Sequence, residues 1–300
     1  MIARRAILLS SVALPGISHF AAAASNTMTI AIHQTTSAGA GYRKSLEGWA
    51  RAGIRHVELT NTALDDFLKT EDLAAARRIL TDLGLTAVQG AVGVTGLWEP
   101  NPNRGAAFDQ LKRRCEMFTA LGLKNVYATT VCTQKVTVDD YKAGAAHMHE
   151  AGDVARSFDL SLRLEFVRSS TFVSTLPTML RMTREAAHPH VAPMFDFYHF
   201  WSGLNKLEDL DLVHPHEIAH VHFQDVPDIP RELLDVTTRV IPGDGVSPLV
   251  PMLQKLHAKG YSGSLSVELF APRYQQGDPF EIAREIRHKC ESVMQRAGVL

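Results

Sequence analysis

Short apolar runs alternate along the chain with longer segments in which apolar positions recur at the spacing of a helix. The short runs contain many β-branched residues, and their length is typical of buried strands. Eight of them are predicted as strands, at residues 28–34, 56–61, 86–92, 125–131, 160–167, 191–197, 218–225 and 264–270.

The longer segments predict helices. Gly53, Gly84, Gly122 and Gly260 stand where helices are expected to end, because glycine readily adopts the left-handed conformation that closes a helix. The helices are expected near residues 41–52, 71–83, 105–121, 138–158, 173–187, 205–213, 247–259 and 279–297.

Eight strands that alternate with eight helices predict an α/β fold, a (β/α)8 TIM barrel. An open doubly wound sheet is the main alternative, but no GxGxxG motif follows the first run. No linker rich in Pro, Gly or Ser divides the chain, so residues 25–300 are expected to form one catalytic domain. The proline-bearing loops 98–105 and 226–245 are expected at the mouth of the barrel.

The first 24 residues have the three parts of a secretory signal peptide. Arg4 and Arg5 precede the apolar stretch 6–14, and the alanine run 21–24 follows. The paired arginines favour a twin-arginine signal, and the mature protein is then expected in the periplasm or outside the cell. The alternative is an N-terminus that is not cleaved.

The composition of the chain excludes several classes of binding partner. The formal net charge is −1, whereas nucleic-acid-binding proteins normally carry a basic surplus. The three cysteines form no CxxC pair, which argues against a disulfide framework or a thiolate zinc site. After the leader no segment is long and apolar enough to span a bilayer. A small-molecule substrate is therefore the expected partner.

In a (β/α)8 barrel the active site lies at the C-terminal ends of the strands. Glu165, Asp196, His222 and Glu268 each close one of the last four predicted strands. Buried carboxylates are costly unless a cation or proton neutralises them, so the four predict a site for Mn²⁺, Mg²⁺ or Co²⁺, with Zn²⁺ also allowed. Taken singly, Asp196 could cap a helix and His222 could be a core histidine, while His220 competes with His222 for the role.

Five motifs give the chain a family resemblance. It resembles the xylose-isomerase-like sugar isomerase/epimerase superfamily, and most of all the 2-keto-myo-inositol isomerase branch. The motifs are LEFV at 164–167, FDFYHF at 195–200, HFQD at 222–225, RVIPGDG at 239–245 and SVELFAPRY at 266–274.

The resemblance implies roles for several residues. It makes Glu165, Asp196, His222 and Glu268 the metal ligands and gives the two glutamates a second role as the acid/base pair. It also places His199 and Arg239 in contact with substrate, although an ion pair that anchors its loop is an alternative role for Arg239. Relatives often pair, so a homodimer is a further implication.

Two aromatic residues fall on the predicted mouth loops. Trp98 and Trp201 could each offer an apolar face to a sugar ring, or could pack within their loops. Glu58 and His33, near the ends of two early strands, are candidates for contacts with the ligands or the substrate.

The expected function is a metal-dependent isomerase or epimerase of a keto-inositol or keto-sugar, acting through an enediolate. One alternative is a lyase that cleaves 3-keto-glycosides by β-elimination with the same residues. Another is a carbohydrate-binding protein without activity. A nuclease is disfavoured, because the third and fourth strands offer Gln89, Tyr127 and Thr129 where multinuclear zinc enzymes of the superfamily carry extra histidines.

Overall fold

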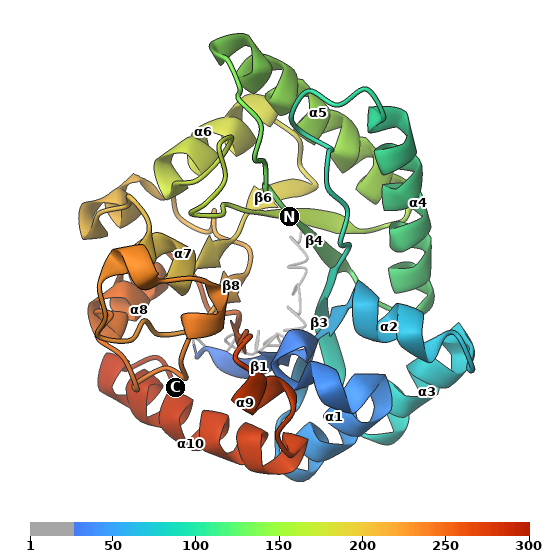
Figure 1. Ribbon diagram of the computed structural model, residues 1–300, viewed down its shortest axis with the longest axis vertical. Coiled ribbons are helices and arrows are strands. Elements are labelled where there is room, and N and C mark those ends of the chain that lie inside the picture. Colours follow the sequence, from blue (N-terminus) through green and yellow to red (C-terminus); the bar gives the residue numbers. More distant parts are fainter. Residues whose placement is uncertain (1–26) are drawn as a thin grey trace, which may run out of the picture.

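A computed structural model describes residues 27–300 (Figure 1). The predicted leader at 1–24 lies outside the described residues, and the structure does not test it. Among residues 27–300, no helix combines the length and the apolar character that crossing a bilayer requires.

The strands form one parallel sheet that curls into a barrel. Their order is β6-β5-β4-β3-β2-β1-β9-β8-β7. They are β1 (Thr29–His33), β2 (His56–Thr60), β3 (Thr86–Ala91), β4 (Asn125–Thr129), β5 (Ser161–Glu165), β6 (Val191–Pro193), β7 (Phe195–Asp196), β8 (Val221–His222) and β9 (Ser264–Val267).

The barrel closes through a single predicted strand. β6 pairs with β5 and β7 pairs with β8, and both lie within the expected strand 191–197. The Met194 N–H donates to the Leu164 carbonyl at 2.9 Å, and the Phe195 N–H donates to the His220 carbonyl at 2.9 Å. The nine assigned strands therefore occupy eight positions, and the predicted (β/α)8 barrel is confirmed.

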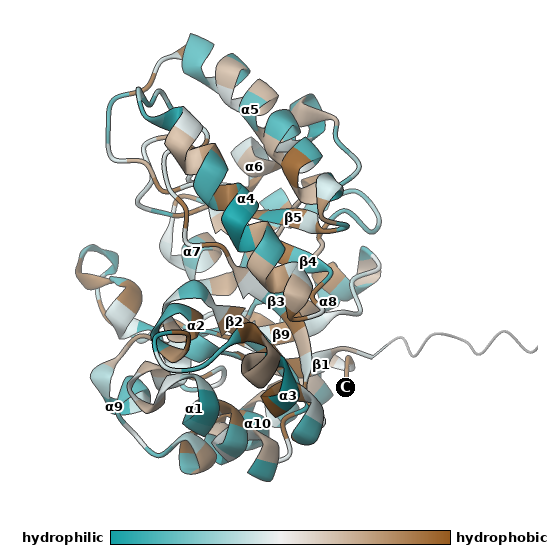
Figure 2. Cartoon of the chain, turned by 90° about the vertical axis from the view of Figure 1, so that its right-hand side faces the viewer, coloured by the Kyte–Doolittle hydropathy of each residue, from teal (hydrophilic) through white to brown (hydrophobic). Residues whose placement is uncertain are grey.

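Helices surround the barrel (Figure 1) and show mixed polar and apolar faces (Figure 2). The longer ones agree with the predicted segments. The α-helices are α1 (Gly41–Arg51), α2 (Asn61–Phe67), α3 (Leu73–Asp82), α4 (Arg104–Ala120), α5 (Val138–Ser157), α6 (Leu176–Ala186), α7 (Phe197–Ser202), α8 (Leu249–Ala258), α9 (Pro272–Gln275) and α10 (Pro279–Ala297).

Two predicted elements differ from the structure. The helix expected at 205–213 is the short 3₁₀ helix η2 (Leu207–Leu212), because this segment buries only Leu210 and needs no extended helical face. The strand expected at 218–225 is only two residues long in β8. Beyond it, Asp225 pairs in antiparallel fashion with Val240 and so leaves the parallel sheet.

Several short helices at the barrel mouth were not predicted from the sequence. They are α2, α7 and α9, together with the 3₁₀ helices η1 (Gln34–Ala40), η3 (Arg231–Leu233) and η4 (Val236–Thr238). Each is too short to show a helical repeat of apolar positions.

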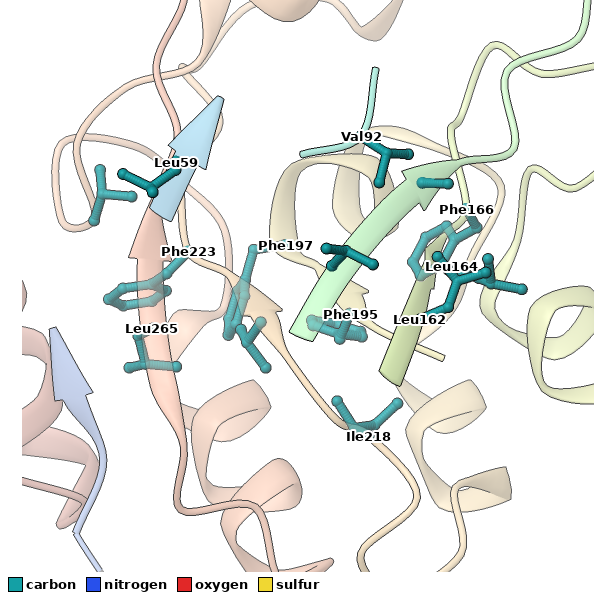
Figure 3. Packing of buried hydrophobic residues seen from close by; sticks show 14 of the residues in the cluster. Leu59, Val92, Leu162, Leu164, Phe166, Phe195, Phe197, Ile218, Phe223 and Leu265 are labelled. Carbon is teal, nitrogen blue, oxygen red and sulfur yellow. The ribbon is translucent and has the colours of Figure 1, made fainter. Parts of the chain in front are cut away.

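The alternation of side chains along each strand separates two layers. Leu162, Leu164 and Phe195 belong to the large core that lies between the strands and the helices (Figure 3). Their neighbours on the same strands, Glu165 and Asp196, point the other way, into the barrel. Alternate residues of each strand therefore face the apolar core and the polar interior of the barrel.

Candidate metal centre

Four side chains converge where the last strands end. Glu165, Asp196, His222 and Glu268 each offer a ligand atom, and these atoms all lie within 4.8 Å of one another. All four residues are buried. The structure thus brings together the four residues that the sequence predicted as ligands.

The Nδ1 atom of His222 lies close to one oxygen of each of the three carboxylates. It is 2.9 Å from Oε1 of Glu165, 3.5 Å from Oδ2 of Asp196 and 3.5 Å from Oε2 of Glu268. Ligands bound at about 2.1 Å lie about 3.0 Å apart at an octahedral metal and about 3.4 Å apart at a tetrahedral one. The observed separations therefore fit a ligand set for one divalent cation, with three oxygens and one nitrogen.

Asp196 both caps a helix and faces the candidate metal site. Its Oδ1 accepts a hydrogen bond from the His199 N–H at 2.6 Å and so caps α7. Its Oδ2 faces His222 and accepts a hydrogen bond from the Gln224 side chain at 3.0 Å. The cap fixes the carboxylate, so that the second oxygen is held toward the centre.

His222, and not His220, belongs to the group of four. The His220 Nε2 atom lies 3.0 Å from Oε2 of Glu58. Both rings point into the barrel, since they are two residues apart on one strand. His220 lies two residues earlier and therefore deeper in the barrel. The sequence alone did not show which of the two histidines joins the carboxylates.

The protonation of the group shows why a cation would be favourable. Burial raises the pKa of the Glu165 carboxyl to about 8. Burial would lower the pKa of His222, but the carboxylates of Glu58, Glu268 and Glu165 raise it well above its ordinary value. Without a metal, protons therefore supply the positive charge that this cluster of carboxylates requires.

Arg239 supplies a permanent positive charge. Its guanidinium is buried, donates to Oε2 of Glu268 and lies 3.4 Å from Oδ2 of Asp196. Burial would raise the pKa of both carboxyls, but Arg239 and nearby histidines hold both below their ordinary values. These contacts include the ion pair considered as the alternative role of Arg239, and contact with substrate stays a prediction.

His199 lies beside Arg239, with its Nε2 atom 3.0 Å from the guanidinium NH2. Burial lowers the pKa of His199 to about 4, so the ring is neutral and accepts this hydrogen bond. On its other side, His199 lines a cavity of about 390 Å³ with Tyr198 and Arg168. Its role in substrate binding stays a prediction.

A second cavity, of about 300 Å³, is lined by one of the four candidate ligands, Glu268. Glu268 lines it together with His33 and Tyr127, whose side chains are hydrogen bonded at 2.9 Å between Nε2 and the hydroxyl. The remaining wall combines hydroxyl and amide groups, from Thr35, Thr60, Asn61, Thr62, Thr95 and Thr129, with apolar groups from Ala91, Val94, Ala128 and Phe270. The cavity is suited to a small molecule that has both polar and apolar surface.

Neither Trp98 nor Trp201 lines either of these cavities. Trp98 is buried in the large core, and its indole N–H donates to the Thr129 carbonyl at 2.9 Å. Trp201 is partly buried against Tyr198, and the Arg231 guanidinium lies 5.4 Å from its ring. Both positions agree with loop packing, the alternative that the sequence left open.

Glu58 is an early-strand candidate from the sequence that contacts one of the four candidate ligands, His222. It is fully buried, and its carboxylate contacts both His220 and His222. Its place at the end of a strand, with a side chain pointing inward, was the available signal. The barrel brings it to residues more than 160 positions away, a pairing that only closure of the sheet creates.

A second histidine cluster lies on the outside, where His149, Asp153 and His188 approach one another. The His188 Nδ1 atom accepts a hydrogen bond from the His190 N–H at 3.1 Å, which leaves the hydrogen on Nε2, 3.4 Å from Asp153. Arg156 also pairs with Asp153 at 2.7 Å. Hydrogen bonds and an ion pair therefore account for this cluster.

Comparison with known proteins agrees with the fold. A family model described as the xylose isomerase-like TIM barrel matches residues 46–291. The inosose isomerase of Bacillus licheniformis is 26% identical over 268 residues, which cover 87% of this chain and 96% of that protein. The 3-dehydroshikimate dehydratase of Pseudomonas putida is 24% identical over 237 residues, which cover 76% of this chain and 36% of that protein.

Among solved structures, that of the IOLI protein with a binding zinc atom superimposes with a TM-score of 0.83. It is 23% identical, and the match covers 90% of this chain and 99% of that one. The match of the family model extends over most of the barrel and confirms the resemblance seen in the five motifs. The chain belongs to the xylose isomerase-like TIM barrel family.

Proposed function

We propose that this protein is a divalent-metal-dependent isomerase or epimerase of a keto-inositol or keto-sugar. The observation that carries the proposal is the pair Glu165 and Glu268, which approach the Nδ1 atom of His222 from β5 and from the end of β9. Two carboxylates at one metal site can act as an acid/base pair, in which a proton is removed by one group and returned elsewhere. The inosose isomerase relative supports the same reaction class.

Glu165, Asp196, His222 and Glu268 would hold the metal. When bound, the metal would polarise the carbonyl of an α-hydroxy ketone and acidify the neighbouring C–H. Mn²⁺, Mg²⁺, Co²⁺ and Zn²⁺ all suit a set of three carboxylates and one imidazole.

The acid/base work falls to the chain's own residues. One glutamate removes the proton next to the carbonyl, which leaves a flat enediolate between the two carboxylates. Return of the proton to the opposite face of the same carbon gives an epimer, and return to the neighbouring carbon gives an isomer. Arg239 donates to Glu268 and also contacts Asp196, and so holds both carboxylates in place.

The cavity beside Glu268 supports a small polyol as substrate. Its volume of about 300 Å³ is at the lower end of the range of about 300–1,000 Å³ that is typical of small-molecule sites. Thr35, Thr60 and Tyr127 offer hydroxyl groups to such a ligand. A single keto-cyclitol or keto-sugar suits this space better than a glycoside with a large aglycone.

A lyase is the second candidate, and the dehydratase relative favours it. The first step is the same, because a base removes the proton next to a carbonyl. The reaction then diverges, as the enediolate expels a group from the next carbon.

Product analysis separates the two. The protein from residue 25 onward, loaded with Mn²⁺, is incubated with keto-inositols, ketohexoses and 3-keto-glycosides, and the products are identified by NMR. The proposal expects an isomer or epimer of a keto-inositol or keto-sugar. Release of an aglycone or of water would show a lyase, and binding without any product would indicate a carbohydrate-binding protein.

A further inference from the structure

Glu58 lies on the far side of His222 from the candidate metal centre. Both of its carboxylate oxygens are 3.2 Å from Nε2 of His222, and Oε2 is also 3.0 Å from Nε2 of His220. The Glu58 side chain is fully buried, and so is that of His222. One carboxylate thus accepts hydrogen bonds from two imidazole rings and has no contact with solvent.

These contacts determine which nitrogen of His222 faces the metal site. A ring that donates its Nε2 hydrogen to Glu58 has Nδ1 as the atom that can bind a metal. Nδ1 is also the atom that faces Glu165, Asp196 and Glu268. The hydrogen bond to Glu58 and the orientation toward the other ligands therefore require the same tautomer.

Aromatic neighbours restrict the ring further. Tyr127 and His33 lie edge-on to His222, with ring centroids 5.2 and 5.5 Å away, and His220 lies 5.6 Å away. His220 in turn holds Glu58 through its own hydrogen bond. The His222 ring can neither flip nor tilt without breaking these contacts.

We propose that Glu58 is a positioning residue for the metal centre, and that it fixes the tautomer and orientation of His222 so that Nδ1 binds the cation. The inference rests on the metal centre of the proposed function. Partners of this kind typically change metal affinity by 10- to 100-fold when they are removed. Glu58 touches neither substrate nor metal and acts only through His222.

The test is a Glu58→Gln variant. Glutamine keeps the shape but carries no charge, and in either orientation its NH₂ group replaces an oxygen that lies 3.2 Å from Nε2 of His222, so a donor faces a donor. Metal-free wild type and variant are titrated with Co²⁺, whose visible absorption reports both the affinity and the geometry of the site. Glu47→Gln, at an exposed glutamate on α1, is the matched control.

We expect Glu58→Gln to bind Co²⁺ about 10- to 100-fold more weakly and with an altered spectrum, while Glu47→Gln matches the wild type. A variant that binds within twofold of the wild type, with the same spectrum, would overturn the role of Glu58 and leave the metal centre intact. A wild type that binds no Co²⁺ would overturn the metal centre and this inference together. A purely structural role would lower the melting temperature of the metal-free variant without changing the affinity.

A second measurement needs no variant. In wild-type protein loaded with Zn²⁺, long-range ¹H–¹⁵N NMR identifies the protonated nitrogen of each histidine. The inference expects His222 to carry its hydrogen on Nε2. A hydrogen on Nδ1 would contradict it, even if Glu58→Gln failed to fold.

Discussion

Asp225 and Gly245 are joined by a hydrogen bond of 3.0 Å from the glycine N–H to Oδ2 of the carboxylate. The same carboxylate accepts from the backbone N–H groups of Val226, Gly243 and Ser247. Asp225 therefore ties together both ends of the loop that carries Arg239. A side chain at 245 would meet the Val226 carbonyl at 2.2 Å, so only glycine permits this close approach.

The first prediction concerns this anchor. Asp225→Asn places an NH₂ donor against backbone donors, so we expect a loss of about 1–3 kcal/mol in the free energy of unfolding. Activity should fall as well, because Arg239 is held less firmly beside Glu268. Denaturant titration and steady-state kinetics measure the two effects.

Asp244 on the same loop provides the control. Its side chain pairs with Lys289 at 2.7 Å near the surface, and such pairs contribute about 0–1 kcal/mol. Asp244→Asn should leave stability and activity almost unchanged. Equal effects of the two substitutions would show that Asp225 has no special anchoring role.

The second prediction concerns protons that the metal displaces. At pH 7 the Glu165 carboxyl, with a pKa of about 8, and the His222 ring, with its raised pKa, both carry a proton in the metal-free protein. Metal ligands must be deprotonated, so binding should release one proton from each group. Because protons compete with the metal below these pKa values, affinity should rise as pH rises toward about 8.

Calorimetric titration at pH 7 in two buffers of different ionisation enthalpy counts the protons released. The same protein, stripped with a chelator, should lose activity and regain it with Mn²⁺. A binding enthalpy that does not depend on the buffer would contradict this account of the metal-free site.

The third prediction concerns Tyr127. The His33 Nδ1 atom accepts from the Thr35 N–H at 3.2 Å, so its Nε2 hydrogen is donated to the Tyr127 hydroxyl. The hydroxyl hydrogen of Tyr127 is then available to an acceptor in the cavity. Tyr127→Phe should raise KM by about 5- to 30-fold, the equivalent of one or two kcal/mol.

Tyr141→Phe serves as the comparison, because the Tyr141 hydroxyl donates to the Phe172 carbonyl and does not line this cavity. Its KM should equal that of the wild type. An unchanged KM in Tyr127→Phe would remove Tyr127 from substrate binding.

Much of the fold and of the candidate centre could be predicted from local pattern. Glu165, Asp196, His222 and Glu268 each end a run of buried residues, and in a barrel all such ends meet at one face. Alternation along the strands fixed their direction as well. These features depend on neighbours in sequence and on one general rule of the fold.

What could not be predicted depends on contacts between distant segments. The pairing of Glu58 with His222 requires the strands to lie at particular heights around the barrel. Trp98 packs into the large core and donates its indole N–H to the carbonyl of Thr129, which lies 31 positions away. β8 ends at His222, and Asp225 pairs instead with Val240 from a distant segment. No periodicity in the sequence encodes these three contacts.

The central claim is that Glu165 and Glu268 transfer protons next to a carbonyl. Its most direct test is incubation of the Mn²⁺-loaded protein in D₂O with a keto-inositol substrate, followed by NMR. The account predicts deuterium at the carbon beside the carbonyl, and a loss of about 100-fold or more in its rate of incorporation in Glu268→Gln and Glu165→Gln. The Glu47→Gln control should exchange like the wild type. Exchange that persists at the wild-type rate in both variants, or no exchange in a wild type that binds metal and substrate, would contradict the assignment.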